Sequence, residues 1–189
     1  MFLVAGLGNP GREHEGDRHN VGFVVVDAIA VRAGADFRAK HQGLVARGSL
    51  RARDVVLLKP QTYMNRSGDS VQPAAAFFKV VPGDVIVVHD EIDLPWGEVR
   101  LKLGGGHAGH NGLRDIIERL GTPEFVRVRV GVGRPASGSR DGKAWVLSGF
   151  DAGQRAELPG VVDRAVDAVE RVVADGVASA MNVVNAKRG

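Results

Sequence analysis

Residues 85–112 read VIVVHDEIDLPWGEVRLKLGGGHAGHNG, and this stretch carries the strongest architectural signal in the chain. Its first four residues are apolar and mostly β-branched, and so short a run indicates a buried strand rather than a helix. The charged cluster 89–93 ends that strand, and a second strand at 99–102 leads into the glycine-, histidine- and asparagine-containing segment 104–111. Titratable groups at the end of a buried strand, facing a glycine loop, are typical of a functional site in an α/β protein. A polar hairpin with a flexible turn is the alternative interpretation.

The composition is that of an ordinary globular protein. The 189 residues are 44% hydrophobic and 25% charged, which suits one domain spanning 1–189. Cysteine is absent, so disulfides and thiolate metal sites are excluded. We see no secretory signal and no run of the ~18 apolar residues that a membrane helix needs. We therefore expect a cytoplasmic protein with no membrane partner, and a pI near 9.6 permits a nucleic-acid partner.

Strands and helices alternate along the chain, which predicts an α/β fold with a mixed, mostly parallel twisted sheet flanked by helices. Asn20 is a suitable N-cap for a first helix, and Pro73 is expected in the first turn of a second one, where its missing N–H matters little. Residues 134–143 are expected to form a loop, followed by a short helix or lid at 145–150. The other predicted strands are 2–5, 43–50, 54–59 and 126–132. The predicted helices are 21–32, 69 or 70 to 80, an amphipathic helix that opens at Gly112, 154–175 and 177–186.

The segment GLGNPG at 6–11 matches the dinucleotide-binding pattern G-x-G-x-x-G. That pattern requires a helix that opens at the third glycine. The residues that follow, REHEGDRHN, are charged and show no apolar periodicity. We interpret the segment as a tight loop that carries Asn9 and leads to His19, and we expect no nicotinamide or flavin cofactor.

Three loops, at 8–19, 61–67 and 104–111, should meet at one end of the sheet. They would bring His19 to Asp90, and a carboxylate beside a histidine fixes the imidazole tautomer and raises the basicity of its other nitrogen. They would also bring asparagines, whose neutral amides can pair with a peptide group or hold a water. A structural histidine and turn-forming asparagines are the plainer alternative. The asparagines are Asn9, Asn65 and Asn111.

Two other chemistries fit the sequence poorly. A serine nucleophile would need Gly-x-Ser-x-Gly at a strand-to-helix turn, and Ser67-Gly68 does not match. A metal could be imagined between His107, Asp90 and His110, but the histidine spacing is not that of two ligands one helical turn apart. We therefore expect no metal.

Basic residues alternate with apolar ones on two predicted strands. Alternation places Arg100 with Lys102, and Arg127 with Arg129, on common faces. One interpretation is a solvated sheet edge. The other is a set of phosphate contacts beside the pocket.

Five segments in order carry a family resemblance: GLGNPG at 6–11, RHNVG at 18–22, YMNRSG at 63–68, HDEIDLP at 89–95 and GGGHAGHNG at 104–112. Together they span nearly the whole chain and resemble the bacterial peptidyl-tRNA hydrolases. The resemblance implies a monomeric α/β enzyme that cleaves the ester between a peptide and tRNA, without a cofactor.

The resemblance also implies residue roles. His19 would be the base that activates water, Asp90 would hold its basic form, and Asn9 would help distinguish blocked from free aminoacyl groups. His14 stands where the family often has a tyrosine that contacts tRNA, and Ala108 replaces a frequent glycine. The remaining contacts to the peptide, the carbonyl or water, and the tRNA phosphates would come from Tyr63, Met64, Asn65, Asn111, Arg100, Lys102 and Arg129.

Two other functions remain open from the sequence. The fold could serve as a non-catalytic RNA-binding module, as in a splicing-factor relative of the family, although the presence of His19, Asp90 and the three asparagines argues against this. A plain esterase on small substrates is the other possibility, and its activity would be insensitive to salt.

Overall fold

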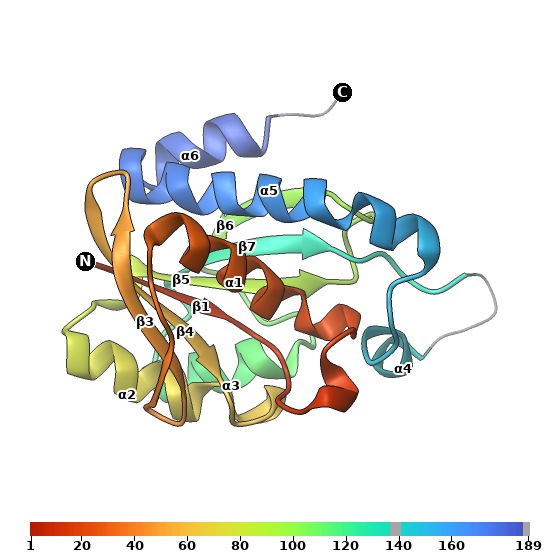
Figure 1. Cartoon of the computed structure of the whole chain (residues 1–189), viewed down its shortest axis with the longest axis horizontal. Helices are drawn as coiled ribbons and strands as arrows, with labels where there is room; N and C mark the ends of the chain where they lie inside the picture. The colour runs from red at the N-terminus through yellow and green to blue at the C-terminus, as the bar shows by residue number, and fades with distance from the viewer. Residues whose placement is uncertain (137–140, 187–189) are drawn as a thin grey trace.

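The computed structural model describes residues 1–136 and 141–186. Its strands form one seven-stranded sheet in the order β2-β3-β4-β1-β5-β7-β6 (Figure 1). Strands β4, β1, β5 and β7 run parallel in its centre. Antiparallel pairs add β3 and β2 on one side and β6 on the other. The mixed α/β sheet expected from the sequence is confirmed. The strands are β1 Phe2–Gly6, β2 Arg38–Lys40, β3 Gly43–Leu50, β4 Arg53–Pro60, β5 Val85–Glu91, β6 Val99–Leu103 and β7 Val126–Gly131.

Helices cover both faces of the sheet, so there are two hydrophobic cores. Helices α1 and α5, with α6, pack on one face, and α2 and α3 pack on the other (Figure 1). The α-helices are α1 Val21–Ala33, α2 Gly68–Phe78, α3 Asn111–Leu120, α4 Gly142–Val146, α5 Ala152–Asp175 and α6 Val177–Val184. Short 3-10 turns are η1 Arg12–His14, η2 Arg18–Asn20, η3 Met64–Arg66 and η4 Pro82–Asp84.

The first helix sits unusually close to the central strands. A Cβ on Gly22 would lie 2.5 Å from both the Leu7 nitrogen and the Val88 oxygen. Only glycine therefore allows the start of α1 to rest on the ends of β1 and β5. Because η2 immediately precedes α1, this contact places residues 18–20 at the carboxyl ends of the two strands.

Helix α2 begins one or two residues earlier than the predicted start at 69 or 70, so the expectation that Pro73 lies in its first turn is wrong. The helix opens at Gly68, and Pro73 is interior. A proline there leaves the carbonyl four residues earlier, that of Asp69, without its usual N–H partner. The side-chain amide of Gln42 donates to this carbonyl at 3.2 Å, so the β2–β3 turn stabilises the proline-containing helix.

The segment before α5 agrees with the sequence only in part. Residues 137–140 of the predicted loop 134–143 lie outside the described residues. A helix does form in the region of the predicted lid, as α4, but it starts before Trp145. Strand β2 was not predicted at all.

The edge strand β6 is covered by the end of α6. The Asn185 side chain accepts a hydrogen bond from the Leu101 nitrogen at 2.8 Å and donates one to the Leu101 oxygen at 2.9 Å. One carboxamide thus satisfies both backbone groups of an edge residue.

Candidate active site

A histidine–carboxylate pair lies where β5 ends beside η2. His19 Nδ1 is 2.7 Å from Asp90 Oδ2, and Asp90 is only 2% exposed. Because the carboxylate can only accept, His19 Nδ1 carries the proton and the Nε2 of the neutral ring keeps its lone pair. The pairing that the sequence predicted is present, with the orientation that a general base needs.

A second histidine holds the other oxygen of the same carboxylate. His110 Nε2 lies 2.9 Å from Asp90 Oδ1, and its Nδ1 accepts from the Leu113 nitrogen at 3.3 Å as the N-cap of α3. The cap fixes the tautomer, so Nε2–H donates to Asp90. From the sequence, His110 is expected only as a possible metal ligand. The visible signal for this role was its N-cap position before an amphipathic helix.

The charges of this cluster shift the pKa values of its members. Burial alone would lower the pKa of His19, but the charge of Asp90 and the hydrogen bond to it, with a contribution from Asp17, raise it above its usual value. Burial would raise the pKa of Asp90, yet His19 and His110 lower it strongly. Asp90 therefore stays ionised, and the pKa of His19 lies above that of a free imidazole.

A third imidazole, His89, lies behind the pair. Its Nδ1 donates to the Asp90 backbone oxygen at 2.8 Å, and no partner for Nε2 occurs among the residues described. Burial first, and then the proximity of His110, lowers the pKa of His89 to about 3. His89 is thus a neutral structural support and not a second base.

Two loops are joined by asparagine amides. Asn20 Oδ1 accepts from the Asn9 nitrogen at 2.8 Å, and Asn20 Nδ2 donates to the Asn9 oxygen at 2.9 Å. Asn9 Oδ1 in turn accepts from the Met64 nitrogen at 2.6 Å. The prediction that the Asn20 side chain caps α1 is wrong, because its amide is used in this relay. The relay fixes the loops at 8–19 and 61–67 relative to each other.

Three predicted contact residues face solvent around this relay. Asn65, in η3, and Asn111, at the start of α3, are exposed, whereas Met64 is 4% exposed and packs into the core. Tyr63 is also exposed, and its backbone has φ 64° and ψ 154°. This conformation is nearly restricted to glycine, and a non-glycine residue there costs of the order of 1–3 kcal/mol.

The loop that carries His19 is anchored to the segment around α4. Arg18 is buried, and its guanidinium lies 3.4 Å from the centre of the Trp145 ring while it donates to Ser148 Oγ at 2.6 Å and Gln154 Oε1 at 2.9 Å. His14, in η1, is 2.8 Å from the Asp17 carboxylate. Arg18 therefore connects the loop that carries His19 to the predicted lid region.

The basic residues of β6 and β7 differ in their surroundings. Arg100 pairs across the strands with Arg129 and ion-pairs with Glu98 at 3.3 Å, while Arg129 ion-pairs with Glu91 at 3.2 Å. Lys102 is exposed, with no ion pair among the described residues. Arg127 was expected to share with Arg129 a face that is solvated or contacts phosphates. For Arg127 this is wrong, because it is buried and donates to the carbonyls of residues 105, 106 and 123. Arg127 holds the glycine loop in place.

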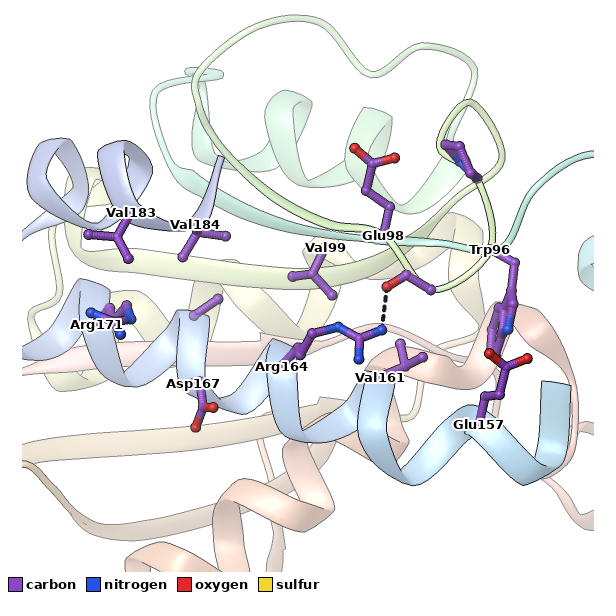
Figure 2. A pocket seen from close by; sticks show the side chains of 13 residues that line it. Trp96, Glu98, Val99, Glu157, Val161, Arg164, Asp167, Arg171, Val183 and Val184 are labelled. Carbon is purple, nitrogen blue, oxygen red and sulfur yellow. Dashed lines mark hydrogen bonds between the residues drawn. The ribbon is translucent and has the colours of Figure 1, made fainter. Parts of the chain in front are cut away.

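A cavity of about 570 Å³ lies between the β5–β6 turn, the start of β6, α5 and α6. Figure 2 shows Trp96, Val161 and Val184 at its wall, with Arg164 donating to the Gly97 oxygen at 2.8 Å. None of the predicted site residues lines it. Its wall consists of elements other than those that present His19 and Asp90.

His19, Asp90 and His110 are also a set of ligating side chains, with one atom from each within 4.8 Å of the others. In this arrangement, however, both carboxylate oxygens already accept imidazole protons. A bound cation would have to displace both protons and free His110 from its N-cap. The hydrogen-bonded form suits proton transfer better than metal coordination.

The family model, the sequence relatives and the solved structure described below all point to one family. The sequence model of the family described as peptidyl-tRNA hydrolase matches residues 3–189. A peptidyl-tRNA hydrolase from Sorangium cellulosum is 58% identical over 189 residues, covering 99% of this chain and 85% of that protein. One from Mycobacterium sp. strain KMS is 52% identical over 187 residues, covering 98% and 97%. The crystal structure of peptidyl-tRNA hydrolase from Acinetobacter baumannii matches with a TM-score of 0.92 at 40% identity, covering 100% of this chain and 96% of that one.

Proposed function

This chain belongs to the peptidyl-tRNA hydrolase family, and from that premise we propose that it hydrolyses the ester between an N-blocked peptidyl group and tRNA, with His19 as the general base. The observation that carries the proposal is the His19–Asp90 pair, whose geometry leaves His19 Nε2 free to accept a proton. Tethering Nδ1 to a buried carboxylate also favours the imidazolium that forms when the proton arrives.

The reaction then runs in two steps. His19 Nε2 removes a proton from water as the water oxygen bonds to the ester carbonyl carbon, which gives a tetrahedral intermediate. The intermediate collapses, the bond to the ribose oxygen breaks, and that oxygen takes the proton from His19. The products are a peptide acid and a tRNA with a free hydroxyl. No covalent enzyme intermediate is needed, because an ester is activated enough for a positioned water.

The asparagines would orient the substrate. Asn9 Oδ1 is occupied by the Met64 nitrogen, so its Nδ2 is the group left to contact the acyl part and to discriminate a blocked from a free amine. Asn65 and Asn111 are exposed on two sides of the relay, and their amides can bind the peptide or place the carbonyl. Tyr63, which is exposed, would complete the pocket wall, whereas Met64 is buried and would contribute through its backbone nitrogen, which fixes Asn9.

The tRNA would be held next to this pocket by phosphate contacts. Arg129 comes from β7, which pairs with β5, and Arg100 and Lys102 come from β6, which pairs with β7. Cations at such positions bind phosphates without reading sequence. His14, tied to Asp17, is a further candidate contact. We propose a monomer that acts in the cytoplasm on tRNA lost from translation. No helix in the described part of the chain is long and apolar enough to span a bilayer.

The decisive experiment compares hydrolysis of N-acetyl-aminoacyl-tRNA with that of unblocked aminoacyl-tRNA. The proposal requires cleavage of the blocked substrate, strong preference for it, and loss of cleavage in His19→Ala with tRNA binding retained. Binding without turnover would favour the RNA-binding module, and equal, salt-insensitive cleavage of small esters would favour a plain esterase. Activity on the blocked substrate should also survive a chelator; inactivation that added zinc reverses would show a metal enzyme.

A further inference from the structure

Arg18 is a buried cation that forms no ion pair in the described part of the chain. Only 3% of the residue is exposed, and burial lowers the pKa of its guanidinium, although the charge of Asp151 opposes this shift. A charge is costly to bury without a charged partner, so its position next to His19 needs an explanation. The guanidinium donates to three neutral oxygens: Ser148 Oγ at 2.6 Å, Gln154 Oε1 at 2.9 Å and the Trp145 carbonyl at 3.4 Å.

These three acceptors belong to one segment, residues 145–154, which we call the anchor segment. It is fixed by bonds of its own, because the Trp145 indole nitrogen donates to the Gly133 oxygen at 2.9 Å and Gln154 belongs to the capping box of α5. Arg18 Cζ lies over the indole ring, 3.4 Å from its centre. A planar guanidinium can lie on an aromatic face and donate from its edge at the same time, which the ammonium group of lysine cannot do.

The main chain joins the same segment at the same place. The Arg18 nitrogen donates to the Ser148 oxygen at 3.0 Å, and the preceding residue, Asp17, forms an isolated β-bridge with Gly149. The turn η2 is therefore attached to the anchor segment at its first residue by both backbone and side chain.

His19 lies between two fixed neighbours in a turn of only three residues. The first residue of η2 is bonded to the anchor segment, and the last, Asn20, is bonded to Asn9. A short 3-10 turn has weak hydrogen bonds of its own, so the direction of the His19 imidazole depends on how its neighbours are held. Its Nδ1 must stay at 2.7 Å from Asp90 Oδ2, and a misplacement of about 1 Å near a reacting group can lower a rate about 10²-fold.

We infer that Arg18 is a positioning residue for the reaction: held by the anchor segment, it fixes η2 so that His19 presents Nδ1 to Asp90 and Nε2 to the substrate. The inference rests on the proposed function of His19. The alternative is that Arg18 only stabilises the fold. Its loss would then lower the melting temperature and leave the turnover of the folded protein unchanged.

Arg18→Lys is the principal test, because it keeps the positive charge and removes the planar group. Turnover of N-acetyl-aminoacyl-tRNA is measured at a temperature at which circular dichroism shows the variant to be folded. We expect kcat to fall about 10–10²-fold while KM stays within about twofold of the wild type, since the base is misplaced and the binding groups are intact.

The second readout is the pKa of His19, obtained without substrate from the NMR titration of its ring proton, which is assigned by comparison with His19→Ala. Burial lowers this pKa and the contact with Asp90 raises it, so a weakened contact in Arg18→Lys should lower it. The other titratable groups near the ring, Asp17 and His110, remain in the variant. A shift therefore reports the position of the imidazole and not the removal of a charge.

Two further variants separate Arg18 from the segment that holds it. Ser148→Ala removes the acceptor at 2.6 Å. It should lower kcat and the pKa of His19 by less than Arg18→Lys does, and it should add nothing further when combined with Arg18→Lys. Arg155→Met is the matched control, because Arg155 also holds the anchor segment, by donating to the Phe150 oxygen at 2.6 Å, but forms no hydrogen bond with η2 in the described structure. It should keep the wild-type kcat and His19 pKa.

Three results would overturn the inference. An unchanged kcat and His19 pKa in Arg18→Lys would make Arg18 a stabilising residue only, and a raised KM at constant kcat would place its effect on binding. Equal losses in Arg155→Met would assign the effect to the anchor segment as a whole. If Arg18→Lys does not fold, wild-type values of kcat and His19 pKa in Ser148→Ala overturn the inference. Failure of the wild type to cleave the tRNA substrate would instead refute the proposed function, while the titration of His19 would still decide whether Arg18 positions the imidazole.

Discussion

Asp90 receives hydrogen bonds from the imidazoles of His19 and His110. The carboxylate of Asp90 and the imidazole of His110 have opposite effects on the pKa of His19. The carboxylate raises the pKa of His19, whereas donation from His110 stabilises the carboxylate and weakens its pull on His19. Removal of the Asp90 charge and removal of the His110 imidazole should therefore shift the acidic limb of the pH–rate profile in opposite directions.

We expect the activity of the wild type to rise through a pKa above the usual ~6.5 of histidine. Asp90→Asn should move this limb to lower pH, and His110→Phe should move it to higher pH. His19→Ala should lower the rate constant by ~10²–10⁴-fold, more than Asp90→Asn does. The measurement is kcat/KM against pH for the four proteins; a limb that stays in place in Asp90→Asn would show that the carboxylate does not act on the base.

His89 should make the fold sensitive to acid. Its pKa is near 3 in the folded protein and near 6.5 when unfolded, so below pH 6.5 only the unfolded chain takes up the proton. Stability should consequently fall as pH drops from about 6 to 4, by up to ~1.4 kcal/mol per pH unit from this group. The carboxyl of Asp90 contributes only below about pH 4, where the unfolded carboxyl protonates.

The measurement is urea unfolding at pH 7, 6, 5 and 4. His89→Asn keeps a donor toward the Asp90 oxygen but has no ring to protonate, so its stability should change less over this range than that of the wild type. Parallel curves for the two proteins would assign the acid sensitivity to other groups.

At the scale of elements, β6 and β7 show that the alternation of basic and apolar residues does not determine which basic side chains are buried. Alternation correctly placed the basic side chains on one face, but it could not distinguish the buried Arg127 from the exposed Lys102. The difference arises from the glycine loop, which folds back so that its carbonyls meet Arg127. Backbone carbonyls contributed by a distant loop have no signature in the strand itself.

We expect Lys102→Gln to flatten the log–log dependence of KM on salt by ~0.7–0.9, the contribution of one phosphate contact. Arg100→Gln should flatten it less, because Arg100 must first exchange Glu98 for a phosphate. Both variants should keep the wild-type kcat. Both should leave the cleavage of an N-acetyl-aminoacyl ester of adenosine unaffected, because that ester lacks the tRNA phosphates. An equal loss on that ester would mean that these side chains support the pocket rather than the tRNA.

At the scale of the whole molecule, the sequence pattern predicts the elements better than it predicts the contacts that hold the site together. Apolar runs and helical spacing predicted most elements, and the loops at 8–19, 61–67 and 104–111 were predicted to converge. The residues that fasten these loops were harder to foresee. Asn20 and His110 each look like a helix cap, and only the close packing of Gly22 and the fold of the glycine loop bring them to Asn9 and Asp90. Residue type and spacing give candidates, while long-range contacts assign their partners.

The carboxamide of Asn185 has a further consequence, for self-association. An edge strand with free N–H and C=O groups is a template on which another copy of the chain can add a strand. At β2 the exposed charges of Arg38 and Lys40 oppose such growth. At β6 the amide of Asn185 occupies both backbone groups of Leu101, beside the exposed charge of Lys102. Asn185→Ala should open that position, so that concentrated protein forms higher-order species in light scattering. Asn182→Ala, an exposed change on α6, should stay monodisperse. If both variants behave alike, the edge is protected by something other than this amide; if they differ, one side chain near the end of the chain limits the growth of the entire sheet.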